Sequence, residues 1–217
     1  MRRRVVLTGL AAILTAPASR LAFAQRSAPR PGVDYQLIPP QPVATGERIE
    51  VVEFFWYGCP HCNNLQPSLE AWLRHKPADV ELRRIPAIFR ESWVPHARLY
   101  YTLEALGEVQ RLHQAVYRSI HGEKDSLASP GATVAWAARH GIEQSRWSTT
   151  YNSPEVERKV EESRSHTRAY NIAGTPSLVV DGRYLTSSGM AESMAEVIAI
   201  LEALIVIARE RRAGSSK

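Results

Sequence analysis

Two cysteines three positions apart, Cys59 and Cys62, constrain the fold of this chain more than any other feature, because they are its only cysteines. The run from Ile49 to Phe55 before them is rich in β-branched and aromatic side chains, which predicts a strand. Apolar residues recur after them at helical spacing, at Leu65, Leu69, Trp72 and Leu73. Both thiols are therefore expected where a buried strand passes into the N-terminus of a helix.

This position matters for the chemistry of a thiol. A helix N-terminus offers unpaired backbone N–H groups and the positive end of the helix dipole, which stabilise a thiolate. Only the thiolate attacks a disulfide, and cysteines in such a setting have lowered pKa values. One cysteine of the pair can attack a partner's disulfide and the other can resolve the mixed disulfide. The spacing therefore predicts a redox-active pair.

Other uses of the pair are weaker interpretations. A structural disulfide across so short a loop would stabilise the chain little. A zinc site needs about four ligands, and the sequence has no second C-x-x-C and no H-x₃₋₅-H. Attachment of a c-type haem needs a histidine directly after the second cysteine, where Asn63 stands. We predict no metal site.

The N-terminus has the features of a cleaved signal peptide. Arg2 to Arg4 form a positive region, Val5 to Ala18 form an apolar stretch, and Ala22-Phe23-Ala24 supplies a cleavage site. The apolar stretch is too short for a membrane anchor, and the adjacent arginines leave a twin-arginine export route open. Removing the four arginines of residues 1–24 from a formal charge of +5 leaves +1, and no basic patch remains that would indicate nucleic acid.

Strand and helix patterns divide the rest of the chain. Short strands are predicted at 35–38 and 80–85, the second lying parallel to the strand before the cysteines. From about Trp93 to Tyr170 the pattern is helical, with helix starts at Ser129-Pro130 and Ser153-Pro154. The histidines of this block lack ligand spacing, which indicates surface or capping roles; they are His96, His113, His121, His140 and His166.

The C-terminal part returns to strand character. Residues 177–180 and 183–185 flank Asp181-Gly182, which predicts a hairpin, and a long helix follows. The basic tail from Arg209 to Lys217 is expected to be solvated and frayed. The predicted organisation is a signal peptide at 1–24, a first α/β part at 25–90, a helical insertion at 91–170, a second α/β part at 171–209 and a tail at 210–217.

This order of elements, with the pair after the first main strand and Gly174-Thr175-Pro176 before the last hairpin, resembles an α/β thioredoxin fold with an inserted all-helical subdomain. The Glu53-Phe54-Phe55 lead into Cys59-Pro60-His61-Cys62 resembles the DsbA family of periplasmic thiol:disulfide oxidoreductases. The resemblance covers nearly all of the chain after the signal peptide. It implies that Cys59 is the exposed nucleophile, that Cys62 is the buried resolving thiol, and that Pro176 is cis and packs against the disulfide.

Three further residues are expected at the site. His61, between the cysteines, can place a hydrogen bond or a positive charge near the Cys59 thiolate, which would make the disulfide a stronger oxidant. Thr175 would offer backbone groups to an extended substrate. Glu53 falls in a run expected to be buried on both faces, with Arg84 as its partner, and the family has an acid at this place, which favours a proton relay. A polar strand face is the alternative for Glu53.

The resemblance implies a monomeric periplasmic oxidase that donates its disulfide to exported, folding proteins and is reoxidised by a quinone-linked membrane partner of the DsbB type. No cofactor beyond the Cys59–Cys62 disulfide is implied. A disulfide isomerase or reductase held reduced is the alternative, because Thr175 is typical of the isomerase branch whereas valine is commoner in DsbA. No dimerisation domain is expected before Tyr35. A non-enzymatic binding protein using the Thr175-Pro176 groove is a third hypothesis.

Overall fold

A computed structural model describes residues 28–215, so the predicted signal peptide lies outside the described residues. A five-stranded sheet forms the centre, in the order β1-β5-β4-β2-β3. Its strands are β1 Gln36–Leu37, β2 Ile49–Phe55, β3 Val80–Pro86, β4 Ser177–Val180 and β5 Tyr184–Ser187. β2 pairs parallel with β3, as predicted, and antiparallel with β4, so it joins the two α/β parts.

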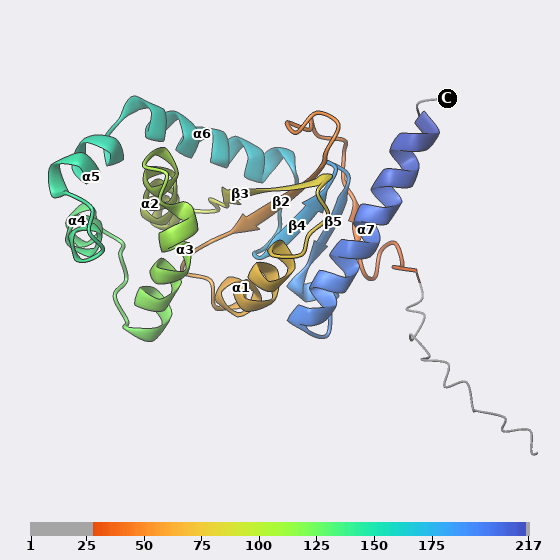
Figure 1. Cartoon of the computed structure of the whole chain (residues 1–217), viewed down its shortest axis with the longest axis horizontal. Coiled ribbons are helices and arrows are strands. Elements are labelled where there is room, and N and C mark those ends of the chain that lie inside the picture. Colours follow the sequence, from red (N-terminus) through yellow and green to blue (C-terminus); the bar gives the residue numbers. More distant parts are fainter. Residues whose placement is uncertain (1–27, 216–217) are drawn as a thin grey trace, which may run out of the picture.

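β2 is buried along its whole length, as its apolar composition predicted. α1, Pro60–Leu73, and α7, Met194–Ser215, pack against each other over one face of the sheet (Figure 1). The side chains buried between them and the strand include Val51, Leu65, Leu69, Leu201 and Leu204. On the opposite face the buried cluster includes Val52, Phe54, Trp93, Tyr170 and Ile172. Hydrophobic burial on both faces therefore fixes β2, and with it the position of the residues that follow.

Five helices form the insertion, which lies at one end of the sheet in Figure 1. They are α2 Val94–Ala105, α3 Val109–Tyr117, α4 Pro130–Arg139, α5 Gln144–Tyr151 and α6 Pro154–Ala169. The predicted N-caps are confirmed, since the Ser129 and Ser153 hydroxyls accept hydrogen bonds from backbone N–H groups of α4 and α6. A π-helical turn, Arg118–Gly122, follows α3 directly.

The predicted C-terminal hairpin is confirmed by backbone geometry. Asp181 and Gly182 adopt φ values of 53° and 63°, the pair of positive angles that a two-residue turn between antiparallel strands requires. A Cβ on Gly182 would also lie 2.4 Å from the Gln41 carbonyl oxygen. Glycine is therefore the residue that fits at position 182 without displacing the backbone at Gln41.

The expectation of a frayed basic tail is wrong for the described part. α7 continues to Ser215, and Arg209 forms an ion pair with Asp79 at 2.6 Å. Arg211 and Arg212 both bind the carboxylate of Asp181, whose side chain is fully buried in the hairpin turn. Burial of a carboxylate is costly without a partner, so these cations hold the helix against the sheet.

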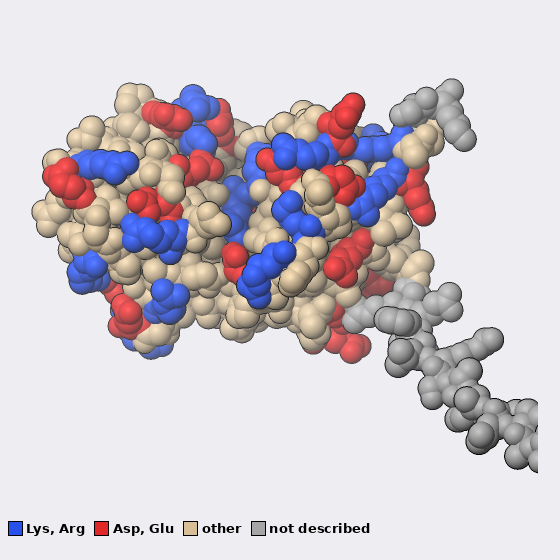
Figure 2. All heavy atoms as spheres, viewed as in Figure 1, with Lys and Arg blue, Asp and Glu red and all other residues tan. Residues whose placement is uncertain are grey.

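Charges of both signs are interspersed over the face shown in Figure 2. None of the helices within residues 28–215 is long and apolar enough to cross a membrane.

Candidate active site

Cys59 is the N-cap of α1, with extended backbone angles, and Pro60 is the first residue of the helix. The Cys59 carbonyl accepts a hydrogen bond from the Asn63 N–H at 3.1 Å, and its own N–H donates to the Trp56 carbonyl at 2.9 Å. Proline suits this first position because its missing N–H would have no partner in the helix. The strand-to-helix placement of the cysteines is therefore confirmed.

The residue before the nucleophile must be glycine. A Cβ on Gly58 would lie 2.3 Å from the indole ring of Trp56. That indole stacks on Trp93, with ring centroids 4.1 Å apart and planes only 4° from parallel. The stack pins the turn between β2 and α1, so the backbone that presents Cys59 has little freedom to shift.

The two sulfurs lie in opposite electrostatic environments. Both cysteines are free thiols here. A hydrogen bond from the Cys62 thiol lowers the pKa of Cys59 to about 5, against the opposing effect of burial, and the Thr175 hydroxyl and the backbone N–H groups of Cys62 and His61 lower it further. Burial raises the pKa of Cys62 well above its ordinary value, and the Cys59 charge adds to this. At neutral pH the reduced pair therefore holds one thiolate and one thiol.

Exposure departs from the expectation for one cysteine. Cys62 is fully buried, as expected, but Cys59 is only 7% exposed rather than an open nucleophile. Its thiol donates a hydrogen bond to the Thr175 carbonyl oxygen at 3.3 Å. His61 is exposed on the first turn of α1, and its contribution to the low pKa of Cys59 comes through its backbone N–H. A role for the His61 imidazole stays a prediction.

The Thr175–Pro176 peptide bond is cis, as the resemblance implied. These two residues stand at the start of β4, beside the cysteines. They line a cavity of about 300 Å³ together with Ser177, Leu185 and Met190. Thr175 therefore connects the Cys59 sulfur to a cavity whose lining is partly apolar and partly polar.

Glu53 is fully buried on β2 and pairs with Arg84 on β3, as predicted, with Nε 2.9 Å from the carboxylate. Gln66 donates a second hydrogen bond to this carboxylate at 2.8 Å. Arg84 also binds Glu70 at 2.8 Å. Burial raises the pKa of Glu53, although the Arg84 charge opposes the shift. The alternative of a polar strand face is wrong, and Gln66 is a partner that sequence reasoning missed.

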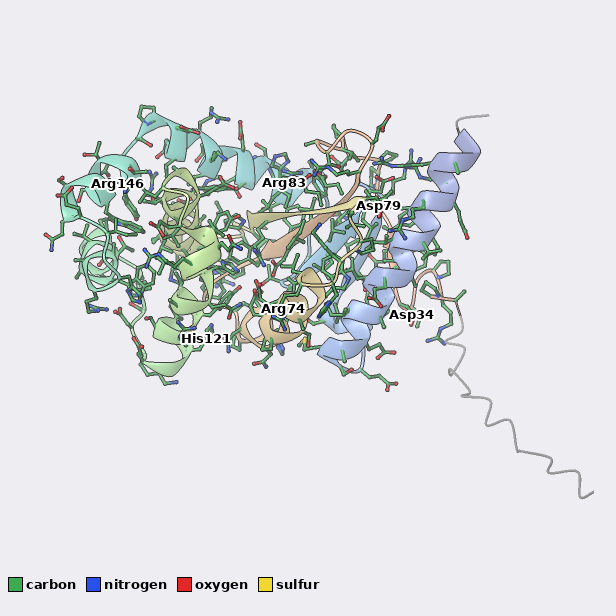
Figure 3. All side chains as sticks on the ribbon, viewed as in Figure 1. Asp34, Arg74, Asp79, Arg83, His121 and Arg146 are labelled. Atoms are coloured by element: carbon green, nitrogen blue, oxygen red, sulfur yellow. The ribbon has the colours of Figure 1, made fainter. Side chains whose placement is uncertain are left out.

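The histidines of the insertion do not all have surface or capping roles. His113 is 2% exposed, and its Nδ1 lies 2.8 Å from the Tyr57 hydroxyl. His96 is 6% exposed and bonds the Ser126 carbonyl. His121 Nε2 lies 2.8 Å from the Tyr57 carbonyl oxygen, at the π-helical turn after α3 (Figure 3). The helical insertion therefore contacts the loop that carries Cys59 directly.

The sequence carried a signal that these residues share one helix face, although not for the residue that they contact. His113, Tyr117 and His121 follow one another at intervals of four residues, which places them along one face of a helix. All three rings pack near Tyr57, whose centroid lies 5.2 Å from that of His113 and 5.1 Å from that of Tyr117. Helical periodicity, rather than metal-ligand spacing, was the relevant pattern.

Comparisons with known proteins agree with this geometry. The family model described as a DSBA-like thioredoxin domain matches residues 84–199. A thiol:disulfide interchange protein DsbA from Burkholderia cepacia is 34% identical over 197 residues, covering 90% of this chain and 93% of the relative. The DsbA of Azotobacter vinelandii is 39% identical over 164 residues, covering 76% of this chain and 77% of the relative.

Solved structures give the same result. The crystal structure of Pseudomonas aeruginosa DsbA superposes with a TM-score of 0.80 at 35% identity, covering 87% of this chain and 97% of that one. The match extends over the sheet and the helical insertion together, which confirms the thioredoxin fold with inserted helices. By family model, sequence and structure alike, the chain belongs to the DsbA family and is a thiol:disulfide oxidoreductase.

Proposed function

We propose that this protein donates the Cys59–Cys62 disulfide to thiols of folding proteins. The low pKa of Cys59, about 5, is the observation that carries the proposal. A thiolate that is stable at neutral pH favours the reduced pair, and a stabilised reduced form makes the disulfide a strong oxidant. The same asymmetry makes Cys59 the better leaving group when the mixed disulfide is resolved.

Donation takes two exchange steps. A substrate thiolate attacks Cys59 Sγ, a substrate–Cys59 bond forms, the Cys59–Cys62 bond breaks, and Cys62 leaves as a thiolate that takes up a proton. A second substrate thiolate then attacks the substrate sulfur of the mixed disulfide, and Cys59 leaves as a stable thiolate. Two substrate thiols are oxidised to one disulfide, and the enzyme disulfide is reduced to a dithiol. The pair carries both electrons, so no further cofactor is proposed.

Supporting residues act around these sulfurs. The backbone N–H groups of His61 and Cys62, which follow Pro60 in the first turn of α1, favour the Cys59 thiolate. The exposed imidazole of His61 would add a hydrogen bond or a positive charge from the solvent side. Glu53, buried with a raised pKa, would relay the proton that Cys62 takes up. Arg84 and Gln66 would hold its carboxylate in place.

The groove lined by Thr175 and Pro176 fits an extended segment of a substrate beside the reactive sulfur. We propose that the substrates are exported proteins with free cysteines, that the protein acts as a monomer in the periplasm, and that a quinone-linked membrane partner of the DsbB type reoxidises it. The signal-peptide pattern of residues 1–24 and the relatives named DsbA support these assignments.

Equilibration with glutathione tests the direction of the reaction. The oxidised protein is expected to be reduced by glutathione far more readily than thioredoxin is, followed by tryptophan fluorescence and by alkylation of Cys59. A potential near that of thioredoxin would instead assign the pair to a reductase or isomerase that is kept reduced. Retained activity in folding assays after Cys59→Ser would favour a binding protein that does not use its thiols.

A further inference from the structure

Tyr117 is the last residue of α3 and stands directly before the π-helical turn. Its side chain is 1% exposed and belongs to the hydrophobic cluster that contains both cysteines and Phe55. It also lines a cavity of about 460 Å³ with Asn63, the neighbour of Cys62 on α1. π-helical turns are frequent at functional sites. The insertion therefore holds this ring in the same buried cluster as the redox pair.

The Tyr117 hydroxyl is buried and has no hydrogen-bond partner among residues 28–215. Two other buried tyrosines are satisfied: Tyr57 is bonded to His113, and Tyr101 is bonded to Ser163. An unsatisfied buried hydroxyl is destabilising, so its retention in a native protein asks for an explanation. A phenylalanine would fill the same space without this cost.

The group that needs a donor in this cluster is Cys62. Its sulfur must become an anion when the Cys59–Cys62 bond breaks, in a place where burial disfavours charge. Burial raises the pKa of Tyr117 well above its ordinary value, and the charge of Cys62 is the next cause. The phenol and the sulfur lie in the same buried cluster and interact electrostatically, and the phenol keeps its proton throughout the reaction.

We propose that the Tyr117 hydroxyl donates a hydrogen bond to the Cys62 sulfur as that sulfur leaves during disulfide donation. The inference deepens the proposed function and rests on it. The proton stays on the phenol oxygen, and the electron pair of the broken bond stays on Cys62 until the sulfur is protonated by another group. A hydrogen bond to a charged atom in a site without water is worth more than one between neutral groups.

Neighbouring polar groups differ in how far their hydrogen bonds are satisfied. His113 is bonded through Nδ1 to Tyr57, and burial lowers its pKa well below the ordinary value, so it is neutral. The carboxylate of Glu53 is held by Arg84 and Gln66. The buried donors around this cluster that have no partner among residues 28–215 are the Tyr117 hydroxyl, the His113 Nε2 and the Trp56 Nε1. The Tyr117 hydroxyl is the one that can rotate toward a developing thiolate, and the charge of Cys62 raises the pKa of Tyr117 but not that of His113.

Tyr117→Phe tests the proposal, with Tyr101→Phe as the matched control because it removes a hydroxyl bonded to Ser163 within the insertion. Reduction of the oxidised protein by a dithiol peptide is timed by rapid-mixing fluorescence, and thermal unfolding is recorded for each variant. Tyr117→Phe is expected to slow reduction about tenfold without lowering the melting temperature. Tyr101→Phe is expected to lower the melting temperature and leave the rate unchanged.

A second readout does not depend on the direction of the reaction. In the Cys59→Ala background, Tyr117→Phe is expected to move the pH midpoint of Cys62 alkylation upward, because the thiolate loses its donor. Incorporation of a fluorinated tyrosine, a stronger donor, at position 117 should move this midpoint downward. Equal rates and equal midpoints in Tyr117→Phe and the parent would overturn the inference. If the wild-type protein fails to oxidise the peptide but the pH midpoints of Cys62 alkylation still shift, the donation proposal is wrong and the contact between Tyr117 and Cys62 is supported.

Discussion

At the scale of single residues, the site turns two identical thiols into different acids. Both cysteines belong to one hydrophobic cluster, but Cys59 faces the donors at the start of α1, whereas Cys62 lies about one turn further along and is fully buried. Position relative to the helix terminus and to solvent decides which form each sulfur prefers. No additional charged side chain is needed to create this difference, because the neighbouring thiol and the backbone N–H groups supply the donors.

The first prediction concerns the titration of Cys59. Its alkylation rate in the reduced protein should reach half of its maximum near pH 5, because the pKa of this thiol is about 5 instead of 9.0. Cys62 should remain unmodified across the same range, since burial raises its pKa. Mass spectrometry of peptides after brief iodoacetamide treatment distinguishes the two sites. A midpoint near that of an ordinary thiol would contradict this account of the site.

Thr175→Val tests the contribution of one donor. The substitution removes the hydroxyl that stabilises the Cys59 thiolate while keeping a β-branched side chain before Pro176. The pKa of Cys59 is expected to rise, and the disulfide to become less oxidising, since the reduced form loses part of its stabilisation. Thiolate ultraviolet absorbance against pH measures the shift. Ser119→Ala is the control, because it removes a buried hydroxyl that is bonded to Glu123 and Trp136 and does not contribute to the pKa of Cys59; it should leave the curve unchanged.

At the scale of elements, local patterns predicted most of the fold. The apolar run of β2, the Asp181-Gly182 turn and the serine caps of α4 and α6 are signals carried by neighbouring residues, and all were confirmed. Contacts between distant elements were missed. His113 bonds a residue 56 positions away, and nothing in its own neighbourhood indicates which side chain will stand opposite it. The burial of Cys59 was missed for the same reason.

The C-terminal helix also makes a contact with a distant residue that the local sequence did not indicate. Its basic end looked solvated because the acid that binds Arg211 and Arg212, Asp181, lies 30 residues earlier in a turn. Asp181→Asn should reduce the free energy of unfolding by about 3 kcal/mol, the low end for breaking a buried ion pair, since both arginines are partly exposed. Asp79→Asn, which breaks the exposed ion pair with Arg209, should reduce the free energy of unfolding by less than about 1 kcal/mol.

A pH dependence accompanies this contact. Burial alone would raise the pKa of Asp181, but hydrogen bonds from Arg212 and Arg211 bring it below its ordinary value. A carboxylate with a lowered folded-state pKa stabilises the protein above the unfolded-state pKa, and the contribution is lost as pH falls through the folded-state value. The difference in the free energy of unfolding between wild type and Asp181→Asn, measured with urea, should therefore become smaller below about pH 4. A difference that stays constant with pH would show that packing, not charge, is responsible.

At the scale of the whole molecule, three parts of the chain share the redox site. β2 and α1 supply the cysteines and Glu53, the second α/β part supplies Thr175 and Pro176, and the insertion supplies the rings around Tyr57. Gln114 on α3 also donates to Gln66 at 3.3 Å, which links the insertion to the buried carboxylate. A change in the charge of the cysteine pair therefore alters the electrostatic environment of groups in all three parts of the fold.

The last prediction follows from this coupling. In the reduced protein Cys59 has a folded-state pKa of about 5, against 9.0 for an ordinary thiol, so the unfolded chain binds more protons between these values. Stability of the reduced form should rise with pH from about 5 to about 9, and be lost as pH falls through 5. The oxidised form has no thiol to titrate, and its short disulfide loop constrains the unfolded chain little.

Urea unfolding of both redox forms at several pH values measures the difference. The reduced form is expected to be the more stable at neutral pH, with the gap closing toward pH 5. A thermodynamic cycle links this gap to the redox equilibrium, because whatever stabilises the folded dithiol over the folded disulfide makes the disulfide easier to reduce. Reduced Cys59→Ser should lose the pH dependence. An oxidised form that is the more stable at neutral pH would contradict both the thiolate assignment and the direction of donation that rests on it.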